Sequence, residues 1–248
     1  MIKRRSIWMC AMALVLTLAG GAAQAGWWGD TVRGSGKTAS EIRSVAGFET
    51  VNANGSMDVQ IKQTGRELVT VSGDDNIVPL IETRVIDKSQ GRTLDIRFKP
   101  GASIHSVSKV LVVIEVIKLQ GVALSGSGDV LIDGVKGDLL EASLSGSGDI
   151  RMVAVECKEI KLRLSGSGDA TLAGRAGQLG IKISGSGDVR AKSMDAESVS
   201  VSIAGSGDAQ VAASKALTVS IAGSGDVAYV GNPSVSSSIA GSGSVKKI

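Results

Sequence analysis

Apolar and polar residues alternate along most of the chain beyond residue 46. Leu162, Arg163 and Leu164 show the pattern in one stretch, and Val199, Val201 and Ile203 are apolar positions of another. A period of two places successive side chains on opposite faces of the backbone and is typical of β-strands. The pattern therefore predicts many short strands, each with one aliphatic face and one polar face.

A repeated turn motif, Gly-Ser-Gly-Asp, separates these strands. Its successive starts differ by 20, 20, 19, 20, 18 and 18 residues, and the copies begin at Gly126, Gly146, Gly166, Gly185, Gly205, Gly223 and, ending in Ser244 instead of aspartate, Gly241. This period matches one coil of a solenoid and is too short for a domain. One coil cannot bury its apolar face, whereas stacked coils share a continuous core. The sequence therefore predicts an all-β fold, a single-stranded parallel β-helix (β-solenoid) with coils of about 18–20 residues.

The solenoid domain is predicted to span residues 46–248, with divergent coils over 46–120 and regular Gly-Ser-Gly-Asp coils over 121–248. Within the divergent part, a degenerate copy of the motif occurs at 55–58, and strands are expected over 59–61, 68–71, 94–98 and 110–117. Ile77, Leu80, Ile81 and Val85 follow helical spacing instead. They predict a short helix that covers the first part of the core.

The N-terminus has the pattern of a secretory signal peptide over residues 1–25. Three basic residues precede an apolar run and the triplet Ala23-Gln24-Ala25, which predicts cleavage after Ala25 and an exported product. Residues 26–45 are predicted to form a flexible leader. Trp27 and Trp28 in this leader either cap the open first coil or anchor the protein to a membrane or partner surface.

Charge and cysteine content exclude several classes of partner and chemistry. The chain has 27 basic and 24 acidic residues, but three of the basic ones lie in the signal peptide, so 24 of each remain. This balance gives no reason to expect nucleic acid as a partner, and no transmembrane segment is expected after residue 25. Cys157 is the one cysteine left, and its apolar flanks predict a buried, unreactive thiol.

Several segments together resemble a known family. They are residues 48–51, 55–61, 73–77 and 93–96, followed by the Gly-Ser-Gly-Asp series. In this order they are similar to the putative autotransporter adhesin head domain, also called the head GIN domain, over about residues 46–248. The resemblance implies a right-handed parallel β-helix in an exported bacterial protein, and it implies no particular activity or ligand.

The aspartates of the motif are the one acidic constellation that the sequence offers. Neighbouring strands lie about 4.8 Å apart, so carboxylates in register would repel each other by about 4 kcal/mol near a protein surface. Hydrogen bonds from the glycine turn that precedes each aspartate would compensate this repulsion. Calcium between successive loops is the alternative, although one aspartate loop per coil offers few ligands. The candidate ladder is Asp129, Asp149, Asp169, Asp188, Asp208 and Asp226.

No catalytic residue and no cofactor are predicted. His105 is the one histidine of the exported chain, which leaves no basis for a histidine triad or a multi-histidine metal site, and a surface or structural role is expected for it. The sequence thus favours a non-enzymatic scaffold or adhesin-like binding module, periplasmic or at the cell surface, that contacts an unknown macromolecule or envelope component. The alternative is a carbohydrate-binding or carbohydrate-active β-helix, which would need carboxylates and basic residues converging in a groove.

Overall fold

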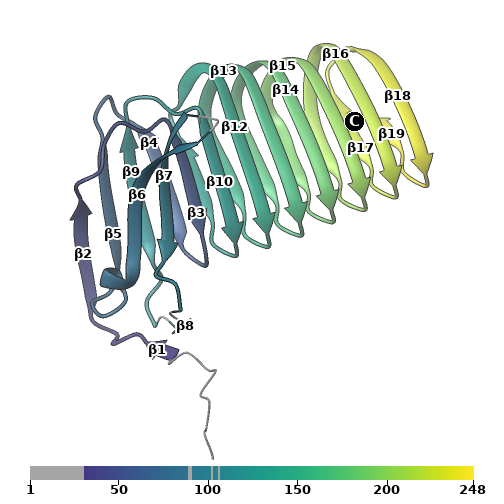
Figure 1. Ribbon diagram of the computed structural model, residues 1–248. Coiled ribbons are helices and arrows are strands. Elements are labelled where there is room, and N and C mark those ends of the chain that lie inside the picture. Colours follow the sequence, from purple (N-terminus) through teal and green to yellow (C-terminus); the bar gives the residue numbers. More distant parts are fainter. Residues whose placement is uncertain (1–30, 89–90, 102, 106) are drawn as a thin grey trace, which may run out of the picture.

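The protein is an elongated β-solenoid in which parallel strands stack in register (Figure 1). The computed structural model describes residues 31–88, 91–101, 103–105 and 107–248. Gly126 pairs with Gly146, Gly146 with Gly166, and so on to Gly241. The predicted all-β solenoid fold is confirmed, because each repeat of the motif adds one coil to the stack.

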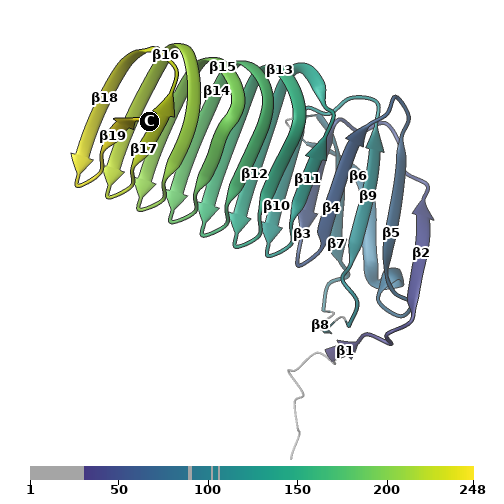
Figure 2. The ribbon, with the colours of Figure 1, turned by 180° about the vertical axis from the view of Figure 1, so that it is seen from behind.

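Each regular coil contributes one strand segment before the motif and one after it. The four longest strands bend at the corner opposite the motif and continue from one side of the solenoid to the other (Figure 2). The strands of this part are β10 (Gly121–Gly126), β11 (Val130–Asp133), β12 (Lys136–Gly146), β13 (Ile150–Gly166), β14 (Ala170–Gly185), β15 (Val189–Gly205), β16 (Ala209–Gly223), β17 (Val227–Val230), β18 (Ser234–Gly241) and β19 (Val245–Lys247).

The segments form two sheets, which we call sheet A and sheet B. Sheet A is formed by the strand segments that precede each motif, and β10 and β18 are two of them. Sheet B is formed by the segments that follow each motif, and these include β11, β17 and β19. Inward side chains such as Leu144 of sheet A and Met152 of sheet B are buried in one aliphatic core. Outward side chains such as Arg163 remain exposed. This is the arrangement that the period of two predicts.

Chain order and stacking order differ in the N-terminal part. The coil made by β3 and β4 stacks directly under β10 and β11, while β7 and β9, later in the chain, lie on its other side. Residues 46–120 are therefore not a simple run of divergent coils. The strands of this part are β2 (Thr38–Arg43), β3 (Thr50–Asn54), β4 (Asp58–Gln63), β5 (Leu68–Asp74), β6 (Ile81–Lys88), β7 (Gly91–Phe98) and β9 (Leu111–Val116).

Antiparallel strands cover the N-terminal end of the stack. In sheet B, β5 pairs with β9 and β2 pairs with β5; in sheet A, β6 pairs with β7. The helix predicted around residues 77–85 is wrong: the segment is a 3-10 turn, η1 (Val78–Leu80), followed by β6. Ile77, Val78 and Ile81 are buried in this turn, so their helical spacing reflects burial at a chain reversal.

Part of the predicted leader is ordered in the structure. Residues 38–43 form β2, and β1 (Thr31–Arg33) pairs with β8 (Ser103–His105). Asp74 is buried and accepts hydrogen bonds from the amides of Gly36, Val107 and Ser108, which ties the two segments together. The predicted signal peptide and Trp27 and Trp28 lie outside the described residues.

Candidate binding face

The aspartates of the motif form a continuous row along one corner of the solenoid. The Oδ1 atom of Asp129 accepts the amide N–H of Asp149 at 3.1 Å, and the same bond recurs at 2.7–3.1 Å from Asp58 to Ser244. The bonds predicted within each glycine turn are thus replaced by bonds to the next coil. The reason is that backbone N–H groups in stacked parallel strands point along the stack and not into their own turn.

The row ends at Ser244, where both the amide and the hydroxyl donate to Oδ1 of Asp226, at 2.8 and 2.9 Å. At the other end, Asp58 from the degenerate motif begins the row. Nη1 of Arg190 forms an ion pair with Oδ2 of Asp169 at 3.0 Å. No group of three or more histidine, cysteine, aspartate or glutamate side chains suited to a metal occurs among the described residues. The calcium alternative remains a prediction to be tested by chelation.

His105 and Cys157 lie apart from each other and from the aspartate row. His105 is exposed in β8 at the N-terminal end. Cys157 is buried in the corner of β13, as predicted, and burial raises the pKa of its thiol above the ordinary range. A raised pKa disfavours the reactive thiolate.

The outer face of sheet A carries a charged region over β12 to β14. Lys161 contacts Glu159 at 3.2 Å and Glu141 at 3.5 Å, and Arg163 lies 4.0 Å from Glu141. The hydrogen bond with Glu159 raises the pKa of Lys161, with smaller contributions from the two carboxylate charges. The carboxylates of this region are therefore engaged by cations of the same face.

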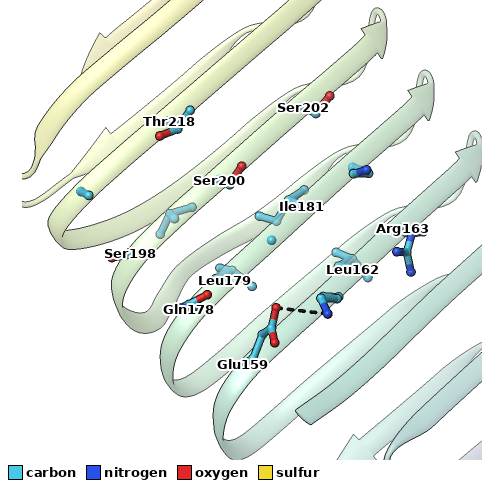
Figure 3. Close-up of a pocket in the computed structure, with 15 residues that line it drawn as sticks. Glu159, Leu162, Arg163, Gln178, Leu179, Ile181, Ser198, Ser200, Ser202 and Thr218 are labelled. Carbon is cyan, nitrogen blue, oxygen red and sulfur yellow. Dashed lines mark ion pairs between the residues drawn. The ribbon is translucent and has the colours of Figure 1, made fainter.

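A hollow of about 350 Å³ lies next to this region (Figure 3). It forms because Gly180 occupies an outward position between Lys161 and Ser200 in neighbouring coils and supplies no side chain. Figure 3 shows the ion pair of Glu159 on one side of the hollow and Ser198, Ser200 and Thr218 on the other. The hollow thus joins a charged region to a hydroxyl-bearing one.

Beyond the hollow, the outer face of sheet A becomes uncharged over three successive coils. Equivalent outward positions align in register, so their side chains form a lattice with about 4.8 Å between coils and about 6.6 Å along each strand. We call this surface the hydroxyl face. Its members are Ser198, Ser200, Ser202, Ala204, Ala216, Thr218, Ser220, Ala222, Ser234, Ser236, Ser238 and Ala240.

The hydroxyl face was not singled out by the sequence reasoning, although serine and threonine at alternate positions of 198–202, 218–220 and 234–238 carry the signal. The aspartates, in contrast, stay in one corner row. Glu159 is the one acidic residue among those that line the hollow on sheet A, and it forms an ion pair with Lys161. The outer face of sheet A is therefore a polar surface with a single acidic residue at its hollow. Acidic and basic side chains converge elsewhere, in a second hollow at the corner opposite the motif that is lined by Glu156, Lys158, Arg175, Asp195 and Glu197.

The sequence and the fold of this chain are similar to those of known proteins. The model of the family described as putative auto-transporter adhesin, head GIN domain, matches residues 47–233. The chain belongs to this family. The resemblance predicted from the sequence is confirmed, and membership indicates an adhesin-like domain with surface or extracellular exposure. A comparison with curated proteins found no match.

Solved structures of other bacterial proteins show a similar fold. A putative adhesin from Bacteroides fragilis has a TM-score of 0.80 and 27% identity, over 88% of this chain and 100% of that chain. A putative adhesin from Parabacteroides distasonis has a TM-score of 0.68 and 27% identity over the same shares. A structure described as a putative lipid binding protein from the latter species, at 23% identity and a TM-score of 0.72 over the same shares, shows the shared fold alone.

Among the described residues, no helix is long and apolar enough to cross a membrane.

Proposed function

We propose that this head GIN protein is a non-enzymatic, adhesin-like binding module of the bacterial cell envelope, located in the periplasm or at the cell surface. The hydroxyl face is the observation that carries this proposal. It presents an uncharged array of small side chains on a rigid sheet, so a partner can dock without displacing ion pairs and without ordering long side chains.

The adhesin-like family and its structural neighbours support a binding role. The charged groups of sheet A and of the aspartate row support the absence of catalysis at these two places. General acid and base chemistry requires groups that can exchange protons at one point, whereas here Glu159 and Glu141 form ion pairs with Lys161 and the aspartates serve as acceptors between coils.

A carbohydrate partner is the second candidate, and the hollow at Gly180 favours it. Its volume of about 350 Å³ falls in the range of small-ligand sites, and Gln178, Ser198 and Ser200 around it offer amide and hydroxyl groups suited to sugar hydroxyls. In this second candidate function the partner is a carbohydrate, and it binds to the same face of the protein.

Binding to glycan arrays and to immobilised envelope fractions tests the proposal. The double variant Ser200→Lys/Ser220→Lys places two charges on the hydroxyl face. The matched control Thr171→Lys/Gln210→Lys places two charges on the outer face of sheet B, where these residues stand at equivalent outward positions. We expect the first variant to lose about tenfold or more in apparent affinity and the control to bind like the wild type.

Equal binding by the two variants would show that the hydroxyl face is not used. Release of reducing ends from a bound polysaccharide would overturn the non-enzymatic role. Fractionation of cells that export the protein separates the periplasmic location from the surface location.

A further inference from the structure

Among the strand pairs of the described residues, charged side chains that face each other have opposite signs with one exception. The exception is Arg163 of β13, which faces Lys182 of β14. Like charges directly opposite each other destabilise a sheet, so an anion at this point would stabilise the pair. The facing residues of opposite sign are Lys136 with Glu156, Glu141 with Lys161, Glu156 with Arg175, Arg175 with Asp195, Lys62 with Asp133 and Glu115, Glu82 with Arg97, Arg84 with Asp95, and Asp87 with Arg92.

The carboxylates around this pair do not balance the cations. Lys161 contacts Glu159 at 3.2 Å and Glu141 at 3.5 Å, and Arg163 lies 4.0 Å from the same Glu141. Lys182 is exposed and forms no ion pair with any described residue. Three cations thus face two carboxylates, which leaves one positive charge beside the uncharged hydroxyl face.

The like-charged pair borders the hollow at Gly180. Arg163 and Lys182 both line the hollow, and Gly180, two residues before Lys182 on the same strand, leaves its space open. Ser200 lies beside Gly180 in the next coil, and Ser202 lies beside Lys182. Figure 3 shows Arg163 at one side of the hollow and the two serines at the other. An anion above the pair would therefore have hydroxyl groups close by, and a ring attached to the anion could occupy the hollow.

We propose that this hollow binds a carboxylated sugar of an acidic polysaccharide. The carboxylate lies over Arg163 and Lys182, and the sugar ring lies in the space above Gly180. A guanidinium group suits this ligand, because its parallel N–H donors match the two oxygens of a carboxylate. Ser200 and Ser202 provide partners for the ring hydroxyls. The proposal rests on the proposed function, since it specifies the ligand of the same face of sheet A.

Three observations favour a sugar over other anionic partners. The volume of about 350 Å³ is in the range of small-ligand sites and exceeds what a free anion requires. None of the large exposed hydrophobic side chains of the described residues lines the hollow, so the acyl chains of a lipid would find no apolar surface there. A single excess positive charge is also too little for nucleic acid, which is held through several phosphate contacts.

Binding of polygalacturonate and of its fully methyl-esterified form tests the proposal, because esterification removes the charge and keeps the sugar. We expect the wild type to bind the acid about tenfold or more tightly than the ester, with a smaller preference at high salt. The variant Arg163→Gln/Lys182→Gln should lose this preference. The control Arg151→Gln/Lys192→Gln removes two exposed cations from the segments that follow the motif, so it changes the net charge equally and should bind like the wild type. Circular dichroism checks that both variants keep the fold.

The variant Ser200→Lys/Ser220→Lys should also weaken binding of the acid despite its added charge, because the longer side chain at position 200 would occupy the hollow. Failure to bind the acid, equal binding of acid and ester, or equal loss in the Arg163→Gln/Lys182→Gln variant and its control would overturn the carboxylate site. So would tighter binding to phosphatidylglycerol vesicles than to polygalacturonate. Each of these results leaves the proposed function standing if envelope fractions or neutral glycans still bind the hydroxyl face. Absence of binding to every glycan and envelope fraction would overturn both proposals.

Discussion

At the scale of single residues, the distance between coils decides which amino acids the turn accepts. A Cβ atom on Gly168 would overlap the carbonyl oxygen of Gly148 in the preceding coil, and one on Gly166, which has a φ of 127°, would overlap that of Gly146. Both glycines of the motif are thus required because the backbone of one coil rests on the backbone of the next. Gly180 is different, since a Cβ there would meet its nearest atom, the carbonyl oxygen of Ile160, at 3.9 Å.

The contrast between these glycines gives the first prediction. Gly168→Ala should lower the free energy of unfolding by about 3 kcal/mol, because the stacked backbones must separate to admit the methyl group. Gly180→Ala should leave it unchanged or raise it by up to about 1 kcal/mol, since alanine loses less conformational entropy on folding. Urea denaturation of both variants measures the difference, and similar midpoints would contradict the stacking argument.

At the scale of elements, a polar cluster fastens the antiparallel end strands to the first coil. Glu115 of β9 accepts hydrogen bonds from Arg66 Nε and Nη2, both at 2.7 Å, and from Thr64 Oγ1 at 2.8 Å. Arg66 and Thr64 lie in the connection between β4 and β5, so the cluster joins this loop to β9. The hydrogen bond of Arg66 chiefly, followed by that of Thr64, lowers the pKa of Glu115 from 4.5 to about 2.

The lowered pKa predicts how this end responds to acid. A carboxyl group with a depressed pKa in the folded state stabilises the fold above its unfolded pKa, and this contribution disappears as pH falls from about 4.5 to about 2. Glu115→Gln should therefore melt at a lower temperature than the wild type at pH 7, and the two melting temperatures should converge near pH 2. Thermal melts across this range measure the effect.

A matched control for the acid experiment is Asp133→Asn, whose longer contact to Lys62 at 3.6 Å lies on an exposed surface. It should change the melting temperature little at pH 7, because exposed single ion pairs contribute little to stability. A constant difference between Glu115→Gln and the wild type at every pH would show that the carboxylate charge is not involved.

At the scale of the whole molecule, the aspartate row connects coils that are far apart in sequence. Asp58 and Asp129 lie 71 residues apart, yet the amide of Asp129 donates to Oδ1 of Asp58. Each carboxylate meets an amide of the next coil, and this contact offsets the repulsion along the row. A charged row is therefore compatible with stacking even without a bound cation.

Chelation tests this interpretation against the calcium alternative. If calcium bridged the aspartates, it would bind the folded state and raise its stability by mass action. We expect a calcium chelator to leave the melting temperature nearly unchanged, because Oδ1 of each aspartate already accepts an amide of the next coil. A large decrease that excess calcium reverses would establish the metal-bound row.

The sequence by itself determined the solenoid and the facing of its side chains. The period of two and the Gly-Ser-Gly-Asp spacing are local properties, and stacking repeats them unchanged from coil to coil, so Leu164 was predictably inside and Arg163 outside. The burial of Cys157 and the presence of a degenerate motif copy at Asp58 were predicted from the same regularity.

Tertiary structure decided what depends on contacts between distant segments. The order of β7, β3 and β10 in the stack, the turn at Val78 in place of a helix, and the ordering of residues 38–43 all arise from pairing across long sequence separations. Likewise, the direction of the aspartate hydrogen bonds depends on which coil lies next to which. A periodic sequence specifies the structure of one regular coil. The arrangement of the irregular N-terminal strands is specified only by the segments that pack against them.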